Sequence, residues 1–298
     1  MDWVFRKGEL SRGDWDVHLD PTEGKIKGWK HTGLRVATLK TGQSLEIKAD
    51  SQERLVLPLE GDGLTVDFKS KDENGSIKLR GRRTVFHGAT DLIYLPINTN
   101  ISISGQGRVI IAEAPATILK PVQFIAKDKF PMSIRGAGPE SRQIHDFGGV
   151  ATLNADRFIV VEVIVPAGNW SGVPPHKHDT YIPGKESNLE EIYYFELAPE
   201  RDTSAPQNVD PKGFFRGYSA DQRPYDLTTE VRSGDVVLVP YGWHGPIGTA
   251  PAYDMYFLNV MAGPDPERVW NVTDEPTHSW IRETWQKKPQ DPRLPYTE

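Results

Sequence analysis

The chain has no cysteine among its 298 residues. A protein without cysteine has neither disulfide bonds nor thiolate ligands, so a cysteine-based structural zinc site is excluded. The sequence also lacks a run of basic residues and an apolar run long enough to cross a membrane. With a net charge of −6 and a pI of about 5.8, nothing favours nucleic acid or an anionic membrane surface as a partner.

The N-terminal segment, Met1–Arg6, lacks the basic stretch followed by an apolar stretch that defines a secretory signal peptide. We therefore expect a cytoplasmic protein, and the absence of cysteine agrees with a reducing compartment. The expected partner is a small molecule, and a homo-oligomer is possible.

Short apolar runs separated by turn residues dominate the chain, which has 27 glycines and 24 prolines. This rhythm predicts many short strands and an all-β sandwich or barrel. One expected hairpin places its turn at Glu60–Gly63, between strands near 54–59 and 64–68. The pattern repeats, so we expect a β domain with an N-terminal arm over 1–145, a second β domain over 146–265, and a tail over 266–298 with a short helix near Trp280.

Residues with metal-binding side chains gather in the second half of the chain. His176 and His178 are two apart, so in an extended strand both imidazoles point to one face. Glu190 and Glu191 begin an apolar strand and point to opposite faces, and alternation alone does not decide between them. His244 follows a further strand. Three histidines and one glutamate predict a site for one divalent metal ion, namely Zn, Mn, Fe or Ni.

These residues resemble the two motifs of the cupin family. The first is His176-Lys-His178 followed by Glu191 and an aromatic-rich strand, and the second runs from Gly234 through Pro240-Tyr-Gly242 to His244. The spacing departs from the usual pattern in both motifs. As a whole, the chain is similar to the two-domain cupins that are 5-deoxy-glucuronate isomerases of inositol catabolism, through the segments PPHKHD, LEEIYYFEL, GDVVLVPYGWHGP, YDMYFLNVMAGP and HSWIRETW.

The resemblance implies two cupin domains, of which only the second holds a metal, with Glu191 as the fourth ligand. It also implies an aldose–ketose isomerase that converts 5-deoxy-glucuronate to 2-deoxy-5-keto-gluconate in bacterial cytoplasm through an enediolate. The alternatives are the sibling 4-deoxy-5-threo-hexosulose-uronate ketol-isomerase, a metal-dependent cupin dioxygenase and a non-catalytic sugar-binding protein with two cupin domains.

Other residues are candidates for contact with a sugar acid. Arg142, Arg216 and Arg223 are candidates for binding its carboxylate, because a guanidinium matches that group with two parallel hydrogen bonds. The alternative for each is an ordinary solvated or paired arginine. Tyr256 and Asp254 share one face of the closing strand and are candidates for proton transfer, with core packing as the alternative. The sequence does not identify the general base.

Overall fold

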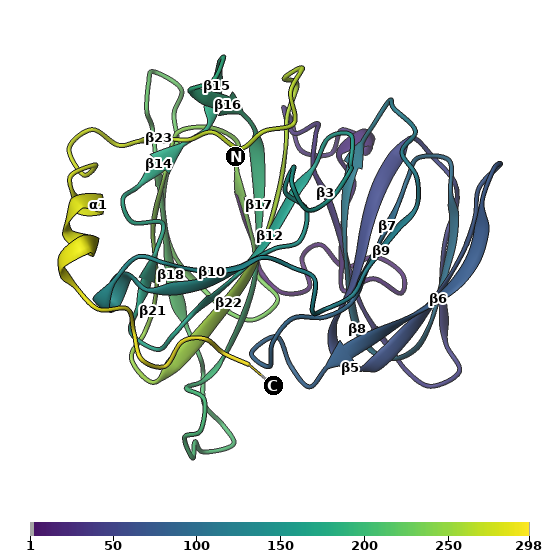
Figure 1. Ribbon diagram of the computed structural model, residues 1–298, viewed down its shortest axis with the longest axis horizontal. Coiled ribbons are helices and arrows are strands. Elements are labelled where there is room, and N and C mark those ends of the chain that lie inside the picture. Colours follow the sequence, from purple (N-terminus) through teal and green to yellow (C-terminus); the bar gives the residue numbers. More distant parts are fainter. Residues whose placement is uncertain (1–2, 298) are drawn as a thin grey trace.

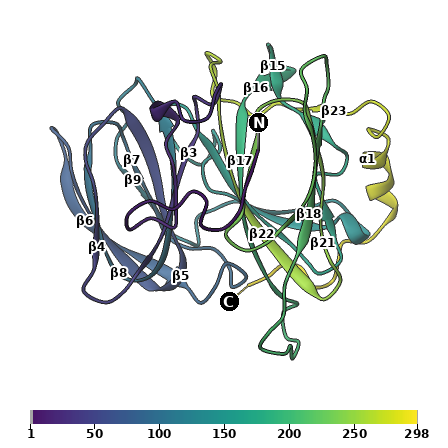
Figure 2. The same ribbon diagram turned by 180° about the vertical axis from the view of Figure 1, so that it is seen from behind.

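The computed structural model describes residues 3–297. Met1 and Asp2, the start of the segment considered for a signal peptide, and Glu298, the end of the tail, lie outside the described residues. Strands form two halves that stand side by side, with the one short α-helix of the described chain, α1 (Ile281–Thr284), at the outer edge of the second half (Figures 1 and 2). The expected all-β class with a C-terminal helix is confirmed. No helix within 3–297 has the length and apolar character needed to span a membrane.

The first half is built on an eight-stranded sheet. Along its main path the order is β2-β3-β8-β5-β7-β9, with β4 paired to β8 and β6 paired to β5. Its elements are β2 (Val17–Leu19), the 3-10 turn η1 (Pro21–Glu23), β3 (Gly33–Leu39), β4 (Ser44–Ile47), β5 (Gln52–Lys69), β6 (Asn74–Arg82), β7 (Leu92–Leu95), β8 (Asn100–Pro115) and β9 (Gln123–Ile125).

The hairpin expected around Glu60–Gly63 is wrong. Strand β5 continues through these residues, and its pairing with β8 shifts register there. Gly63 has a φ of +135°, and a Cβ at this position would lie 2.5 Å from the Leu79 carbonyl oxygen. The glycines therefore allow a bulged strand to pass close to its neighbours rather than to reverse direction.

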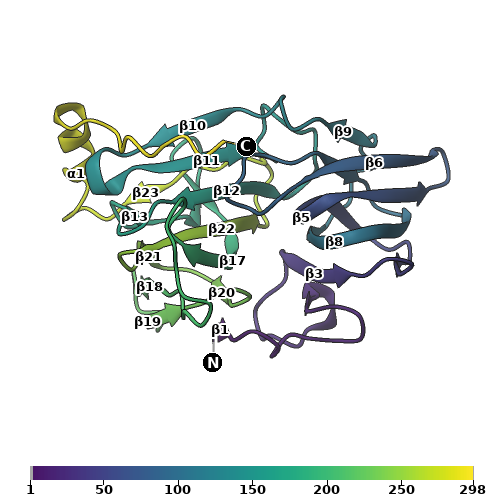
Figure 3. The same cartoon turned by 90° about the horizontal axis from the view of Figure 1, so that it is seen from below.

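The second half contains two sheets and a small hairpin. The seven-stranded sheet has the order β1-β20-β17-β22-β12-β11-β10, and β1 and β10 lie at its opposite edges (Figure 3). Its strands are β1 (Val4–Phe5), β10 (Met132–Arg135), β11 (Arg142–Asp146), β12 (Ile159–Val165), β17 (Glu190–Pro199), β20 (Val236–Val239) and β22 (Tyr253–Ala262).

The second sheet of this half has the order β19-β18-β21-β14-β23, with β13 paired to β21. Its strands are β13 (Trp170–Ser171), β14 (His176–Lys177), β18 (Gly213–Tyr218), β19 (Asp226–Val231), β21 (Trp243–Thr249) and β23 (Thr273–Asp274). The remaining elements are the hairpin strands β15 (Asp179–Ile182) and β16 (Glu186–Asn188) and the 3-10 turns η2 (Gly138–Glu140) and η3 (Trp285–Lys287).

The chain does not divide cleanly at residue 145. Strands β1, β10 and β11, all within the range predicted for the first domain, pair in the seven-stranded sheet of the second half. Val4 lies opposite Val237, so the first strand of the chain completes an edge formed near its other end. Periodicity indicates where strands occur but carries no signal for which sheet a terminal strand joins.

The seven-stranded sheet is buried on both faces. Side chains such as Ile192 and Tyr194 on β17 pack in one cluster with Leu55 and Tyr94 of the first half, and this joint core forms the seam between the halves. The intervening residue, Tyr193, packs on the other face, inside the second half. This alternation separates the seam from the interior of the second half.

Buried carboxylates also connect the halves across the seam. Glu162 on β12 forms an ion pair with Arg82 at the end of β6, and the shortest distance between their charged atoms is 2.8 Å. Glu53 on β5 accepts hydrogen bonds from the backbone N–H groups of Asp156, Arg157 and Phe158, at 2.7, 2.7 and 3.0 Å. These polar contacts therefore fix how the two halves align across the apolar seam.

Candidate metal centre

Three histidines meet inside the second half. His176 on β14 lies directly opposite His244 on β21, and His178 follows two residues after His176. One ring nitrogen from each histidine lies within 4.8 Å of the corresponding atoms of the other two. The structure thus brings together the residues that the sequence pattern predicted to converge.

Glu191 lies beside these histidines. Its Oε2 atom is 3.1 Å from Nε2 of His178 and 3.1 Å from Nε2 of His244. Glu190 is on the opposite face of β17, where it accepts backbone hydrogen bonds from Lys30, His31 and Thr32 of the first half. The fold therefore settles the choice that alternation left open, because only Glu191 faces the histidines.

Backbone carbonyls orient all three imidazoles in the same way. In each ring Nδ1 faces a carbonyl oxygen, which leaves Nε2 directed toward the centre of the cluster. The pairs are His178 with Leu189 at 3.1 Å, His176 with Pro174 at 3.4 Å, and His244 with Gly242 at 3.4 Å. Such a contact fixes the tautomer of a metal-binding histidine.

The donor set fits a divalent cation. Nε2 of His244 is buried and has no hydrogen-bond partner in the described chain, because its contact with Glu191 lacks hydrogen-bond geometry. A buried nitrogen of this kind is costly unless a ligand satisfies it. Three imidazole nitrogens and a carboxylate suit Zn, Mn, Fe or Ni, and the donor types do not select among them.

Electrostatics favour an ionised Glu191 beside a neutral His176. Burial and the neighbouring His244 and His178 hold the pKa of His176 well below its usual value. Burial alone would raise the pKa of Glu191, but its contacts with His178 and His244 outweigh burial and lower the pKa to about 2. Burial likewise opposes charge on His178, yet Glu191 raises its pKa. The cluster therefore has an ionised carboxylate at its centre, as a cation site requires.

Asp179 ties together the two segments that carry the ligands. Its side chain accepts hydrogen bonds from Lys177 Nζ at 2.7 Å, from the Gly242 backbone N–H at 2.9 Å and from Arg223 Nη2 at 2.6 Å. Asp179 adjoins His178, and Gly242 precedes His244 by two residues. One buried carboxylate thus fixes the distance between the first and second histidine motifs, and Lys177 points away from the ligands.

A pocket of about 140 Å³ opens beside His176 and Glu191, and three arginines line it: Arg135, Arg142 and Arg282. Arg142 is buried, donates to the Glu140 carbonyl oxygen at 3.1 Å and lies over the Trp285 ring. No carboxylate of residues 3–297 forms an ion pair with Arg142 or Arg135, whereas Arg282 pairs with Asp274.

The arginines give this pocket a positive potential. Burial, followed by the charges of Arg135 and Arg282, lowers the pKa of Arg142 to about 9, so the guanidinium is still charged at neutral pH. A buried cation without a counter-ion is unfavourable, and a bound anion relieves that cost. The pocket therefore places the candidate metal ligands beside positive charge that suits an anion.

A second group of potential metal ligands, His18, Asp20 and Glu23, lies in the first half. Glu23 already contacts Arg12 and Lys25, and both ion pairs are short. Burial first, then the charges of Arg35 and Arg12, lowers the pKa of His18 to about 4. Unlike Glu191, the Glu23 carboxylate of this group is therefore already paired with two cations.

The family model described as KduI/IolB matches residues 4–281. The chain belongs to this family. It is 35% identical over 287 residues to the 5-deoxy-glucuronate isomerase of Geobacillus thermodenitrificans, covering 92% of this chain and 97% of that protein. The resemblance predicted from the motifs is thereby confirmed.

Solved structures agree with membership of the KduI/IolB family. The IolB-like protein of Salmonella typhimurium superimposes with a TM-score of 0.79 at 31% identity, covering 94% of this chain and 99% of that one. The oxalate decarboxylase of Lactobacillus farciminis superimposes with a TM-score of 0.63 at 11% identity, covering 97% of each chain, and this likeness shows the fold alone. Together they confirm the predicted pair of cupin domains.

The three candidate arginines lie in different places in this KduI/IolB member. Arg142 lines the metal pocket. Arg216 contacts Asp226 at the surface, and Arg223 pairs with Asp221 and Asp179. Neither Arg216 nor Arg223 lines the pocket, because their guanidinium groups are already engaged by carboxylates.

The structure places Tyr256 and Asp254 away from the metal pocket. They lie on the face of β22 that packs toward the seam, where Tyr256 lies near Arg82 and Asp254 accepts from the Tyr296 hydroxyl at 3.0 Å. Phe257 and Asn259, on the other face, line the pocket. This corrects the expected proton-transfer role at the metal, since a side chain on the far side of a sheet cannot reach the substrate.

The pocket residues that were not candidates from the sequence include Arg135, Tyr193 and Arg282. Tyr193 shares a strand face with Glu191, and this two-residue spacing is a signal that was available. Arg282 comes from the tail, which reaches the pocket because β23 pairs with β14. Pairing between segments so distant in the chain leaves no local signature.

Proposed function

We propose that this protein is an aldose–ketose isomerase that converts 5-deoxy-glucuronate into 2-deoxy-5-keto-gluconate. Membership of the KduI/IolB family and the named activity of its curated relatives support an isomerase. The observation that carries the proposal is the joint pocket, in which the ligand set of His176, Glu191 and their neighbours adjoins Arg142 and Arg135. A sugar acid has a carbonyl group at one end, which suits the metal ligand set, and a carboxylate at the other end, which suits the two arginines.

One divalent metal ion would be held by His176, His178, Glu191 and His244. When bound, it supplies a Lewis acid that stabilises negative charge developing on the carbonyl and adjacent hydroxyl oxygens of an enediolate.

The chain's own residues bind and orient the sugar acid. Arg142 and Arg135 bind its carboxylate, and the ion pair between Arg282 and Asp274 joins α1 to β23, which pairs with β14 beside the pocket. Fixing the carboxylate sets the position of the reacting carbons relative to the ligand set. The surrounding Trp270 and Phe257 exclude water from the pocket.

We assign to Tyr193 the role of donating a hydrogen bond to a substrate oxygen. Burial first, then the nearby charge of Glu191, raises the pKa of the Tyr193 hydroxyl well above its usual value. The hydroxyl therefore stays protonated and acts as a hydrogen-bond donor rather than as a base. The reaction moves one proton from the hydroxyl-bearing carbon to the carbonyl carbon and one from the hydroxyl oxygen to the carbonyl oxygen, so no redox partner is consumed.

The test is to incubate metal-loaded protein with 5-deoxy-glucuronate under anaerobic conditions and follow the ketose by NMR, with metal content measured on the same sample. We expect ketose formation and roughly one metal ion per chain. Absence of turnover in a metal-loaded sample would contradict the proposal, and oxygen uptake with another substrate would identify a dioxygenase.

The family description covers a second uronate isomerase, so 4-deoxy-5-threo-hexosulose-uronate is the necessary comparison substrate. We expect a higher kcat/KM for 5-deoxy-glucuronate, since the curated relatives carry that name. The reverse order would assign the chain to the sibling activity. Cytoplasmic location and a homo-oligomeric state remain predictions.

A further inference from the structure

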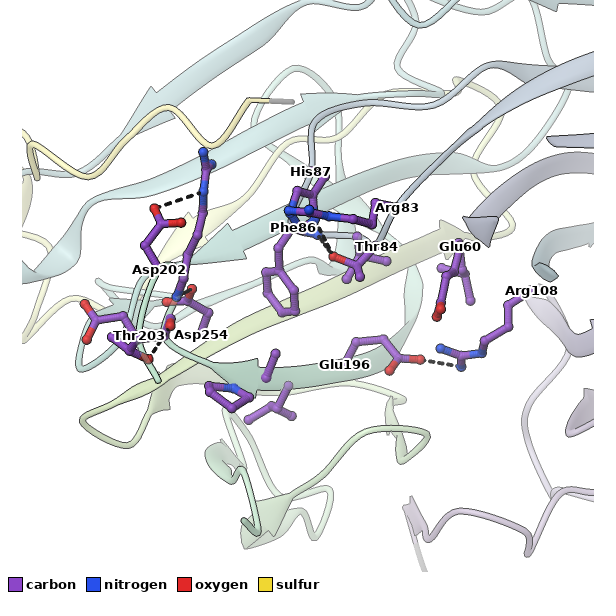
Figure 4. Close-up of a pocket in the computed structure, with 17 residues that line it drawn as sticks. Glu60, Arg83, Thr84, Phe86, His87, Arg108, Glu196, Asp202, Thr203 and Asp254 are labelled. Atoms are coloured by element: carbon purple, nitrogen blue, oxygen red, sulfur yellow. Dashed lines mark hydrogen bonds and ion pairs between the residues drawn. The ribbon is translucent and has the colours of Figure 1, made fainter. Parts of the chain in front are cut away.

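A larger pocket, of about 370 Å³, lies at the seam between the two halves (Figure 4). It is formed by the loop after β6, the bulge of β5, the end of β17 and the loop that follows β17. Glu196 on β17 points toward it, on the strand face opposite Glu191. The seam pocket is therefore separate from the metal pocket.

Positive groups gather at one end of the seam pocket. Arg83 donates from Nε to Nε2 of His87 at 3.0 Å, and His87 Nδ1 lies 2.7 Å from the Thr84 hydroxyl. Since Nε2 accepts from a guanidinium, His87 is the neutral tautomer with its proton on Nδ1. Burial, then the charges of Arg83 and Arg201, lower the pKa of His87, which places both arginines in its field.

These two arginines have little compensating negative charge. Within residues 3–297, no carboxylate forms an ion pair with Arg83. Among the carboxylates of the described residues, Arg201 pairs only with Asp202, at 3.7 Å, and the Asp202 side chain is 90% exposed. The Arg201 guanidinium also donates to the Thr297 carbonyl oxygen at 3.2 Å and lies over the Tyr296 ring, and neither contact neutralises its charge. An ion pair that exposed contributes little to neutralising a charge.

Most carboxylates that line the pocket already have partners elsewhere. Glu196 accepts from Arg108 and Tyr194, Glu200 pairs with Arg293, and Asp254 accepts from Tyr296 and from the Arg201 backbone N–H. Glu60 lies in the field of Arg108, on the other side of the pocket from His87 (Figure 4). The end around Arg83 and Arg201 is thus the part of the pocket whose charge suits an anion.

The rest of the lining suits the body of a small organic molecule. Phe86 and Val85 are buried and form an apolar wall, and Leu59, Leu197 and Pro199 extend it. The volume falls within the range of small-molecule sites, roughly 300–1,000 Å³. Guanidinium groups recognise the planar or tetrahedral oxygens of carboxylates and phosphates.

We propose that the seam pocket is a second ligand site, in which Arg83 and Arg201 bind the oxyanion of a small sugar acid or sugar phosphate. His87 and Thr84 are positioning residues that direct the Arg83 guanidinium. The first half, which lacks the metal ligands, thereby contributes a binding function of its own. This inference does not depend on the isomerase activity.

Isothermal titration calorimetry on the metal-loaded full-length protein tests the site, with D-gluconate as the carboxylate probe and D-glucose 6-phosphate as the phosphate probe. We expect at least one probe to bind, and Arg83→Gln or Arg201→Gln to raise its Kd at least tenfold. Arg216→Gln is the matched control, because it removes a guanidinium outside both pockets, and it should leave the Kd unchanged. Which probe binds identifies the oxyanion.

A variant of the metal pocket separates the two sites. Arg142→Gln should not change the Kd of the probe that Arg83→Gln weakens. The proposal is overturned if neither probe binds, if both seam-pocket variants bind like the wild type, or if only Arg142→Gln weakens binding. Thermal unfolding of each variant shows whether a lost signal is lost folding, and Arg83→Gln is expected to match the wild type because Arg83 is exposed.

Discussion

The side chain of His244 is the most enclosed member of the ligand set, with no exposed surface. His244→Ala removes a metal donor but no backbone hydrogen bond, and Glu191 keeps its contact with His178, so the sheets should remain intact. We expect metal content to fall below about a tenth of the wild-type value, since loss of one of four ligands removes a main source of affinity. Metal analysis after dialysis measures this, and circular dichroism verifies the fold. His87→Ala, outside the ligand set, should retain the metal, and full metal content in His244→Ala would contradict the site.

Arg142 should act on substrate binding rather than on metal binding. Arg142→Gln removes a charged hydrogen-bond donor to a carboxylate, worth about 1.5–3 kcal/mol, so KM should rise roughly 10- to 100-fold. Steady-state kinetics with 5-deoxy-glucuronate tests this, with Arg216→Gln as the control. An unchanged KM would remove Arg142 from the carboxylate site.

At the scale of elements, the two histidine motifs are joined through Asp179 rather than through the ligands alone. Asp179→Asn keeps the size of the side chain but weakens its hydrogen bonds to Lys177, Gly242 and Arg223. Loss of a group that orients metal ligands costs roughly 10- to 100-fold in metal affinity. We expect a shift of that size in a competition titration with a chelator, together with a changed Co(II) absorption spectrum. Asp226→Asn, which breaks a surface contact to Arg216, is the control, and equal affinities would show that Asp179 only fills space.

The strands themselves were largely predictable, and their assembly was not. Alternation and turn residues indicated β12, β17, β20 and β22, because each is a short apolar run bounded by Gly, Pro or charged residues. At Glu60–Gly63 the same signals wrongly predicted a turn, because the glycines there form a bulge within β5. The ligand set followed from local spacing and resemblance, whereas Arg282 and Arg135 reach the pocket through β23 and β10. Such pairings depend on tertiary contacts between distant segments, so no local sequence pattern predicts them.

At the scale of the whole molecule, the buried pair of Arg82 and Glu162 joins the halves. Both side chains have no exposed surface, and His145 Nδ1 lies 2.6 Å from Glu162. Removing one charge leaves the other uncompensated, which costs about 3–5 kcal/mol. We therefore expect Glu162→Gln to lower the free energy of unfolding by that order in urea denaturation, while metal content stays unchanged. The exposed acid variant Glu230→Gln should have almost no effect.

The same pair predicts how stability depends on pH. Burial would raise the pKa of Glu162, but Arg82 and His145 outweigh burial and lower it. A carboxylate with a lowered pKa contributes stability above its unfolded pKa, near 4.5, and loses it as the pH falls toward the folded value. The difference in unfolding free energy between wild type and Glu162→Gln should therefore shrink below about pH 4.5. A difference that is constant down to pH 3 would contradict this account.

The pairing of β1 with β20 has a consequence for the order in which the protein is made. On the ribosome, Val4 emerges early, but its partner Val237 is synthesised only when most of the chain is complete. Domains usually fold as units while translation proceeds. The β1–β20 edge of the catalytic half therefore cannot form until late in translation. Until then, the first segment of the nascent chain has no native strand to pair with.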